Sequence, residues 1–304
     1  MNQIPVIDMS TFGEHPDEDR RIADEIGENA RTLSFMSMTG HGVPNSLVAD
    51  AFDVMRRVFL TDMTEEQRLA YEFPEIGRQV GYTPTRIERS VGQERYNHMR
   101  WWHVMDPKCG ITNVFPTEVP EFGPTMLNLH AALKGFAAHV LRAVAIHLHR
   151  DPEFFVRWIE CGTNLLRTIH YPAITEGEDA GPRSGSHKDI NIITVLVPAT
   201  QPGLRVRGPD GAWIDANNPT GTLIVNFGDM MEKHTFGELK STEHEVCNPG
   251  TACDDRFSMP IFIHPDEERI LVGAGAYKRR RLREINLMPR LPENEIDYQD
   301  IKDT

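Results

Sequence analysis

The chain has 304 residues, 39% hydrophobic and 25% charged, a balance typical of globular proteins that excludes whole-chain disorder and fibrous structure. Its 32 lysines and arginines against 45 aspartates and glutamates give a net charge of −13, which disfavours nucleic acid and anionic membrane surfaces as partners. Four irregularly spaced cysteines match neither a zinc motif nor a disulfide scaffold, so we expect reduced thiols in a cytoplasmic protein.

The first part of the chain has strand and helix patterns. Residues 4–8 (IPVID) form a β-branched run typical of a strand, and residues 17–38 have helical spacing. A turn at 40–44 (GHGVP) precedes a second helical segment over 47–59. A third helix begins near Thr64, where TEEQ has the form of a capping box.

The rest of the chain changes from loops to a helix and then to strands. Residues 73–122 hold scattered prolines and predict long loops with short strands, which in a compact enzyme are often functional. After Pro124, apolar residues recur every three or four positions and predict a long helix that ends by 151. From residue 163 the period changes toward two, and turn-rich segments between short runs indicate a β-sandwich or jelly roll. These runs are 165–171, 189–197, 203–208, 221–228, 242–246 and 256–263.

One short motif among the strands has the chemistry of a metal site. We expect His187-Lys188-Asp189 to open a strand, so that alternation puts the side chains of His187 and Asp189 on one face. A third ligand has to come from elsewhere, and His244 lies on a later predicted strand. Two imidazoles and one carboxylate form the facial triad of non-haem Fe(II) oxygenases. Taken alone, a His-x-Asp pattern is also explained as a solvated or salt-bridged pair.

A second group of polar residues suits a carboxylate ligand. Arg256 and Ser258 alternate onto one face of the predicted strand 256–263. A guanidinium offers a planar fork to a carboxylate, and a hydroxyl adds another donor. Tyr171, at the end of another predicted strand, adds a phenolic hydroxyl. Taken singly, Arg256 is also explained as a surface cation and Tyr171 as a core-edge tyrosine.

With these motifs in place, the sequence resembles the isopenicillin N synthase-like Fe(II)/2-oxoglutarate-dependent dioxygenases. The segments IPVID, GHGVP, HYP, His-x-Asp, LIVNFGDMME, KSTEHEV and RFSMPIFI follow the family's order over nearly the whole chain. The resemblance implies a single α+β domain over 1–304. Within it, residues 1–120 form an N-terminal helical and substrate-loop region, and residues 160–265 form a double-stranded β-helix (jelly-roll) core.

The same resemblance implies a site and a reaction. It places iron on the two histidines and the aspartate named above, and the distal carboxylate of 2-oxoglutarate on Arg256 and Ser258, assisted by Tyr171. The implied cofactors are Fe(II), 2-oxoglutarate and O₂. The implied reaction oxidises a small-molecule substrate by hydroxylation, desaturation or ring closure, with release of succinate and CO₂.

Two departures from the family pattern leave roles open. The family commonly has Asn-Tyr-Tyr-Pro where this chain has Ile169-His170-Tyr171-Pro172, so only Tyr171 carries over and the role of His170 is open. The family also commonly has Trp-Thr-Asn-Gly where this chain has HTFG, beginning at His234. Any supporting role of His234 is therefore open as well.

Two other functions stay open at the level of the sequence. A few family members are oxidases that need no 2-oxoglutarate and use the arginine and serine on the substrate's own carboxylate, and succinate formation distinguishes them. The other alternative is a non-catalytic jelly-roll binding module that has lost the metal. An inability to bind Fe(II) or Mn(II) would favour that alternative.

The predicted loop region also points to a class of substrate. Residues 86–103 hold four arginines beside three aromatic residues on an acidic chain. We predict that Arg100, which adjoins two tryptophans, contacts a carboxylate-bearing metabolite such as an amino acid. Pairing of these arginines with Glu88 and Glu94 on a solvated loop is the alternative. The basic run at 278–283 (KRRRLR) indicates a solvated helix start rather than a nucleic-acid patch.

Overall fold

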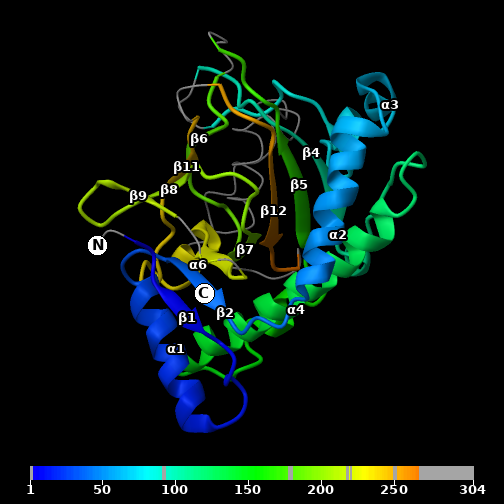
Figure 1. Ribbon diagram of the computed structural model, residues 1–304. Coiled ribbons are helices and arrows are strands. Elements are labelled where there is room, and N and C mark those ends of the chain that lie inside the picture. Colours follow the sequence, from blue (N-terminus) through cyan, green and yellow to red (C-terminus); the bar gives the residue numbers. More distant parts are fainter. Residues whose placement is uncertain are drawn as a thin grey trace, which may run out of the picture.

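The computed structural model describes residues 3–90, 94–176, 181–216, 219, 221–248 and 252–266, so the basic run at 278–283 lies outside the described residues. An eight-stranded and a four-stranded sheet form the β core, and helices gather along one side of it (Figure 1). This is the α+β jelly-roll architecture that the sequence predicts.

The strands of the two sheets mix segments from distant parts of the chain. The larger sheet has, in spatial order, β1 (Val6–Asp8), β2 (Phe35–Thr39), β10 (Leu223–Phe227), β7 (Ile193–Val197), β12 (Arg256–Ile263), β5 (Leu165–Tyr171), β4 (Arg100–Met105) and β3 (Gly81–Thr83). The smaller sheet has β6 (Ser184–His187), β11 (His244–Val246), β8 (Leu204–Arg207) and β9 (Trp213–Asp215). Apart from the parallel pair β1 and β2, the paired strands named here are antiparallel.

The helices support the larger sheet. They are α1 (Pro16–Ala30), α2 (Asn45–Arg56), a π-helical turn (Arg57–Thr61), α3 (Glu65–Leu69), α4 (Phe122–His147), α5 (Val156–Ile159), α6 (Asp229–His234) and two 3₁₀ turns (Pro74–Ile76 and Pro107–Cys109). Helix α4 packs against β4, β5, β7 and β12 and also against α1 and α2. By length and composition α4 could cross a membrane, but 56% of its most apolar window is buried in the fold, as in the core helix of a soluble protein.

Strand alternation sorts the side chains of the larger sheet between two faces. Val195 on β7 and Met259 on β12 belong to the main apolar core, which also contains the buried side of α4. Thr194 and Ser258 are their neighbours in sequence and therefore point the other way, into the space between the sheets. The helices thus fix the outer face of the sheet, and polar side chains are left on its inner face.

The predicted helix over 17–38 is wrong in its second half. Helix α1 ends at Ala30, and Ser34, with a φ of 57°, turns the chain into β2. Strand β2 lies between β1 and β10, and its first four residues are all buried. A strand that is buried on both faces has no alternation of apolar and polar residues, so its pattern does not distinguish it from a buried helix.

Other predicted elements are confirmed with small shifts. The capping box at the start of α3 is present, with Gln67 N donating to Thr64 Oγ1 at 3.2 Å and Thr64 N donating to Gln67 Oε1 at 2.8 Å. The long helix is α4, and the run 256–263 is β12 over the same residues. The second helical segment is α2, which continues into the π-helical turn.

Candidate active site

The smaller sheet brings His187, Asp189 and His244 together. His187 is the last residue of β6, and its partner across the β6–β11 pair is His244. The prediction that His187-Lys188-Asp189 opens a strand is wrong, because β6 ends at His187 and Asp189 lies in the connection to β7. The three residues nevertheless converge, with one ligand atom of each lying within 4.8 Å of the others.

Both imidazoles turn the Nε2 atom toward Asp189. The Nε2 atoms of His187 and His244 lie 3.8 Å and 3.7 Å from Asp189 Oδ1. Their Nδ1 atoms lie 2.8 Å from the carbonyl of Gly185 and 3.1 Å from that of Thr242. An Nδ1–H that donates to a carbonyl leaves the lone pair on Nε2, which is the arrangement typical of metal-binding histidines.

Two side chains of the larger sheet donate hydrogen bonds to the Asp189 oxygen that points away from the two imidazoles. Thr194 Oγ1 donates to Asp189 Oδ2 at 2.6 Å, and Asn226 Nδ2 donates to the same oxygen at 2.8 Å. Burial acts to raise the pKa of Asp189, but the neighbouring imidazoles and these two hydrogen bonds outweigh it and hold the pKa below its ordinary value. An ionised carboxylate therefore presents Oδ1 to the two imidazoles.

The protonation of His244 also suits a metal ligand. Burial, reinforced by the nearby His187, lowers the pKa of His244 to about 4, so its imidazole is neutral at pH 7. Two neutral imidazoles and one carboxylate are the donor set of non-haem iron(II) sites. In the part of the chain that the structure describes, these three residues are the one group of His, Cys, Asp or Glu side chains with this geometry.

The predicted carboxylate site lies at the start of β12. Arg256 is paired with Tyr171 across the β5–β12 pair, and its guanidinium carbon lies 4.8 Å from the centroid of the Tyr171 ring. Arg256, Tyr171 and Ser258 are all buried. Arg256 Nε donates to the carbonyl of Gln201 at 3.0 Å, whereas the buried Nη1 has no hydrogen-bond partner among the residues that the structure describes. Because a buried donor without a partner costs about 1–3 kcal/mol, this atom suits an anionic ligand.

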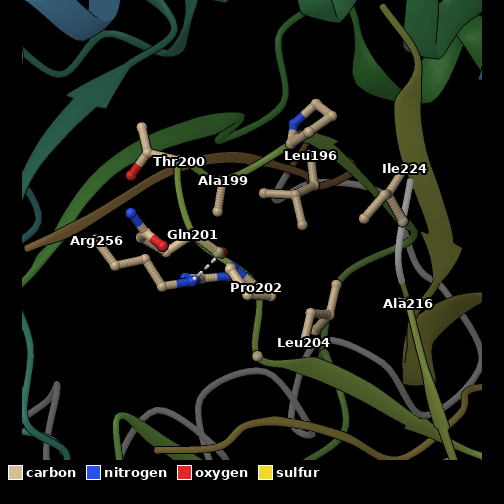
Figure 2. Close-up of a pocket in the computed structure, with 11 residues that line it drawn as sticks. Leu196, Ala199, Thr200, Gln201, Pro202, Leu204, Ala216, Ile224 and Arg256 are labelled. Carbon is tan, nitrogen blue, oxygen red and sulfur yellow. Dashed lines mark hydrogen bonds between the residues drawn. The ribbon is translucent and has the colours of Figure 1, made fainter. Parts of the chain in front are cut away.

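A cavity of about 230 Å³ lies beside Arg256 (Figure 2). None of the three converging residues lines it, but Leu196 on β7 and Ile224 on β10 do. Each of these lies two residues from Thr194 or Asn226, on the same face of its strand. The cavity therefore extends from Arg256 to strand positions next to the two residues that hold Asp189.

The inner faces of β4 and β5 carry a polar group that the sequence analysis missed. Arg167 Nε donates to His103 Nε2 at 2.9 Å, and its Nη1 donates to Glu88 at 3.1 Å. Its guanidinium carbon lies 4.6 Å from the ring centroid of Trp101. Burial holds the pKa of His103 well below its ordinary value, so the imidazole stays a neutral acceptor. Alternation with Tyr171 along β5 could have placed Arg167 on the inner face.

Arg100 is placed apart from the other predicted site residues. Its Nε donates to His170 Nδ1 at 2.9 Å, its Nη1 to Glu65 at 2.7 Å and its Nη2 to the carbonyl of Phe59 at 3.1 Å. All three guanidinium nitrogens thus have protein partners, which tie β4 to α3 and to the π-helical turn. Contact between Arg100 and a substrate stays a prediction.

His170 ties together the two strands that carry the carboxylate site. Its Nε2–H donates to Asp255 at 2.6 Å, and its ring stacks on Phe257 with a centroid separation of 4.8 Å. Burial, reinforced by the charge of Arg100, lowers the pKa of His170 to about 4. His170 and Asp255 directly precede Tyr171 and Arg256 in the chain. Because neighbouring residues of a strand point to opposite faces, the hydrogen bond between His170 and Asp255 lies on the other face of the sheet from Tyr171 and Arg256.

His234, where the sequence departs from the family pattern for the second time, has a packing role. The His234 ring meets Trp158 edge-on at a centroid distance of 4.6 Å and also contacts Phe155. Burial lowers its pKa. His234 therefore belongs to an aromatic cluster at the end of α6.

Comparisons with known proteins agree with this geometry. Residues 162–265 match the model of the 2OG-Fe(II) oxygenase superfamily, and residues 4–118 match that of the non-haem dioxygenase in morphine synthesis N-terminal region. A Caulobacter crescentus structure described within the 2OG-Fe(II) oxygenase family is 30% identical, with a TM-score of 0.79, and the match covers 92% of this chain and 98% of that one. The chain belongs to the 2OG-Fe(II) oxygenase family.

Relatives of this oxygenase include enzymes of fungi and bacteria. The 2-oxoglutarate-Fe(II) type oxidoreductase hxnY of Emericella nidulans is 26% identical, with 88% of this chain and 80% of that protein covered. Validamycin A dioxygenase of Streptomyces hygroscopicus subsp. limoneus is 28% identical, with 90% and 80% covered. A full-length Neurospora crassa protein solved in complex with alpha-KG shares the fold, with a TM-score of 0.82 at 24% identity over 92% of this chain and 96% of that one. This oxygenase is accordingly an enzyme that uses Fe(II), 2-oxoglutarate and O₂.

Proposed function

We propose that His187, Asp189 and His244 hold the iron(II) with which this oxygenase oxidises a small-molecule metabolite. The observation that carries the assignment is the approach of both Nε2 atoms to Asp189 Oδ1, at 3.8 Å and 3.7 Å, with each Nδ1 near a backbone carbonyl. Three ligands on one face leave positions open for cosubstrate and O₂. When bound, iron(II) and 2-oxoglutarate supply the activation of O₂, with release of succinate and CO₂.

We assign the distal carboxylate of 2-oxoglutarate to Arg256, with Ser258 and Tyr171 as supporting donors. The unpartnered Nη1 of Arg256 supports this role, and so does the cavity that the guanidinium lines. Ser258 lies two residues further along β12 and faces the same way. Because the site is buried, hydrogen bonds from these groups to a carboxylate face little competition from water.

For the substrate, we propose a small metabolite with an apolar body and a carboxylate. On the inner faces of β4 and β5, the buried Trp101 ring and the Arg167 guanidinium lie against each other, so an aromatic group and a cation occur together on the face of the sheet that carries the site, which supports this class. Glu88 balances the charge of Arg167 and fixes its position. The net charge of −13 favours a small molecule over a nucleic acid.

The test is succinate formation from 2-oxoglutarate by the purified enzyme with Fe(II), O₂ and a panel of metabolites. The panel pairs each carboxylate with its amide, so that the substrate class is tested together with the reaction. We expect coupled succinate release with at least one carboxylate, weaker release with its amide, and none with the Asp189→Ala variant. Equal succinate release by wild type and Asp189→Ala would refute the iron assignment, and equal release with both members of each pair would refute the substrate class.

A further inference from the structure

Arg183 is a second buried arginine near the carboxylate site. Its exposed fraction is 2%, the same as that of Arg256. It directly precedes β6, whose register against β11 shifts between the His187–His244 and Ser184–Val246 pairs, so its side chain is placed by its contacts and not by simple alternation. Its Nη2 donates to the carbonyl of Asp254 at 3.1 Å and to Cys253 Sγ at 3.0 Å.

The segment before β12 brings Arg183 close to Arg256. Asp254, whose carbonyl accepts from Arg183, lies two residues before Arg256. Val246 is paired with Ser184, the residue after Arg183, and packs in one apolar cluster with Tyr171. Burial lowers the pKa of Arg256, and the charge of Arg183 lowers it further. Arg183 therefore lies close to Arg256, although it belongs to the segment that leads into the smaller sheet and Arg256 to the larger sheet.

No carboxylate of the described part of the chain pairs with these two positive charges. Among the residues that the structure describes, neither guanidinium is hydrogen-bonded to or paired with a carboxylate: Arg256 bonds to a carbonyl, and Arg183 to a carbonyl and a sulfur. Arg256 Nη1 and Arg183 Nε are both buried, and neither has a hydrogen-bond partner within the described ranges. Burying two like charges near each other is unfavourable unless an anion is bound between or beside them. The two buried guanidiniums therefore suit a ligand that carries a negative charge at the end next to them.

We propose that Arg183 is a second cation of the 2-oxoglutarate site and binds the distal carboxylate together with Arg256. This inference rests on the proposed function and deepens it. Each guanidinium has an unused N–H to give, and the carboxylate has two oxygens that can accept from both. The bound carboxylate links the two sheets, because its donors come from β12 and from the start of β6. A 2-oxo acid of equal length without the distal carboxylate gains nothing from Arg183.

The alternative is that Arg183 only anchors the segment 252–255 through its bonds to Cys253 and Asp254. Loss of that anchor would disturb the site for any ligand, whereas loss of a carboxylate donor affects only ligands that carry the distal carboxylate. Comparison of 2-oxoglutarate with 2-oxopentanoate, which has five carbons and no distal carboxylate, separates the two roles.

The experiment is isothermal titration of the full-length Mn(II)-loaded protein with each of these two acids. For Arg183→Met we expect affinity for 2-oxoglutarate to fall about tenfold or more, because a charge-assisted hydrogen bond is lost. Affinities for 2-oxopentanoate and for Mn(II) should stay at the wild-type level. Arg207→Met is the matched control, since Arg207 lies on β8 with 43% of its side chain exposed and is paired with Glu243.

Arg183→Gln provides a second variant if the methionine variant does not fold, because glutamine keeps a donor for the carbonyl of Asp254 but has no charge. It should also lose affinity for 2-oxoglutarate alone. Equal losses for both acids, or wild-type affinity for 2-oxoglutarate in a folded variant, would overturn the role of Arg183. Failure of the proposed function looks different: wild type itself would not bind 2-oxoglutarate, or Arg256→Met would bind it as tightly as wild type.

Discussion

Replacement of Thr194 by valine tests whether the support of Asp189 sets the metal affinity. Valine has nearly the shape of threonine but cannot donate the 2.6 Å hydrogen bond to Asp189 Oδ2. Loss of a hydrogen bond to a metal-binding carboxylate typically lowers affinity about 10–100-fold, which corresponds to about 1.4–2.8 kcal/mol. Because Asn226 still donates to the same oxygen at 2.8 Å, we expect a value near the lower end of that range.

Anaerobic calorimetric titration with Fe(II), repeated with Mn(II), measures this effect directly. Thr168→Val is the matched control: Thr168 is fully buried on β5, and its hydroxyl donates to the carbonyl of Trp102 at 3.2 Å. That variant should bind metal as wild type does, even if it is less stable. The reasoning fails if Thr194→Val keeps wild-type metal affinity, or if both valine variants lose affinity equally.

Three further outcomes are expected. Asp189→Ala should abolish measurable Fe(II) binding in the same titration, because it removes the charged ligand. Arg256→Met should raise the apparent 2-oxoglutarate constant about tenfold or more in steady-state kinetics, since a charge-assisted hydrogen bond contributes about 1.5–3 kcal/mol. The pKa of His170 falls from 6.5 to about 4 on folding, so the unfolded chain binds more protons between these values and stability decreases as pH falls from about 6.5 to 4. Between pH 7 and 5, His170 therefore lowers the free energy of unfolding by about 2 kcal/mol. Urea unfolding of the His170→Gln variant should not show this loss. An identical pH dependence of stability in wild type and variant would contradict the assignment.

Local sequence patterns are sufficient to predict the core of the fold, but they do not predict all of its strands. Alternation and turn residues predict β12 over its observed range, and the 3.6-residue period predicts α4. Strand β2 was missed because its neighbours β1 and β10 come from distant parts of the chain, and burial by both removes the periodic pattern.

The candidate site shows the same division between local motifs and long-range contacts. His-x-Asp is a local motif, but the contribution of Thr194 and Asn226 depends on their pairing across β7 and β10. Arg167 and Glu88 likewise meet only in the folded chain. The prediction for Arg100 rests on its position beside Trp101 and Trp102, yet alternation along β4 puts Arg100 on the face opposite to Trp101, together with Trp102.

The register between β5 and β12 determines which side chains form the carboxylate site. Tyr171 is opposite Arg256, and His170 is opposite Phe257. Because side chains alternate, a slip of one residue in β12 would remove Arg256 from the inner face and put a neighbour in its place. The bond from His170 to Asp255 and the stacking of His170 on Phe257 both oppose such a slip from the outer face. His170 stands where the family commonly has the first tyrosine of its Asn-Tyr-Tyr-Pro motif. This replacement is compatible with the carboxylate site, because His170 stabilises the register of the two strands from the outer face and leaves Tyr171 on the inner face.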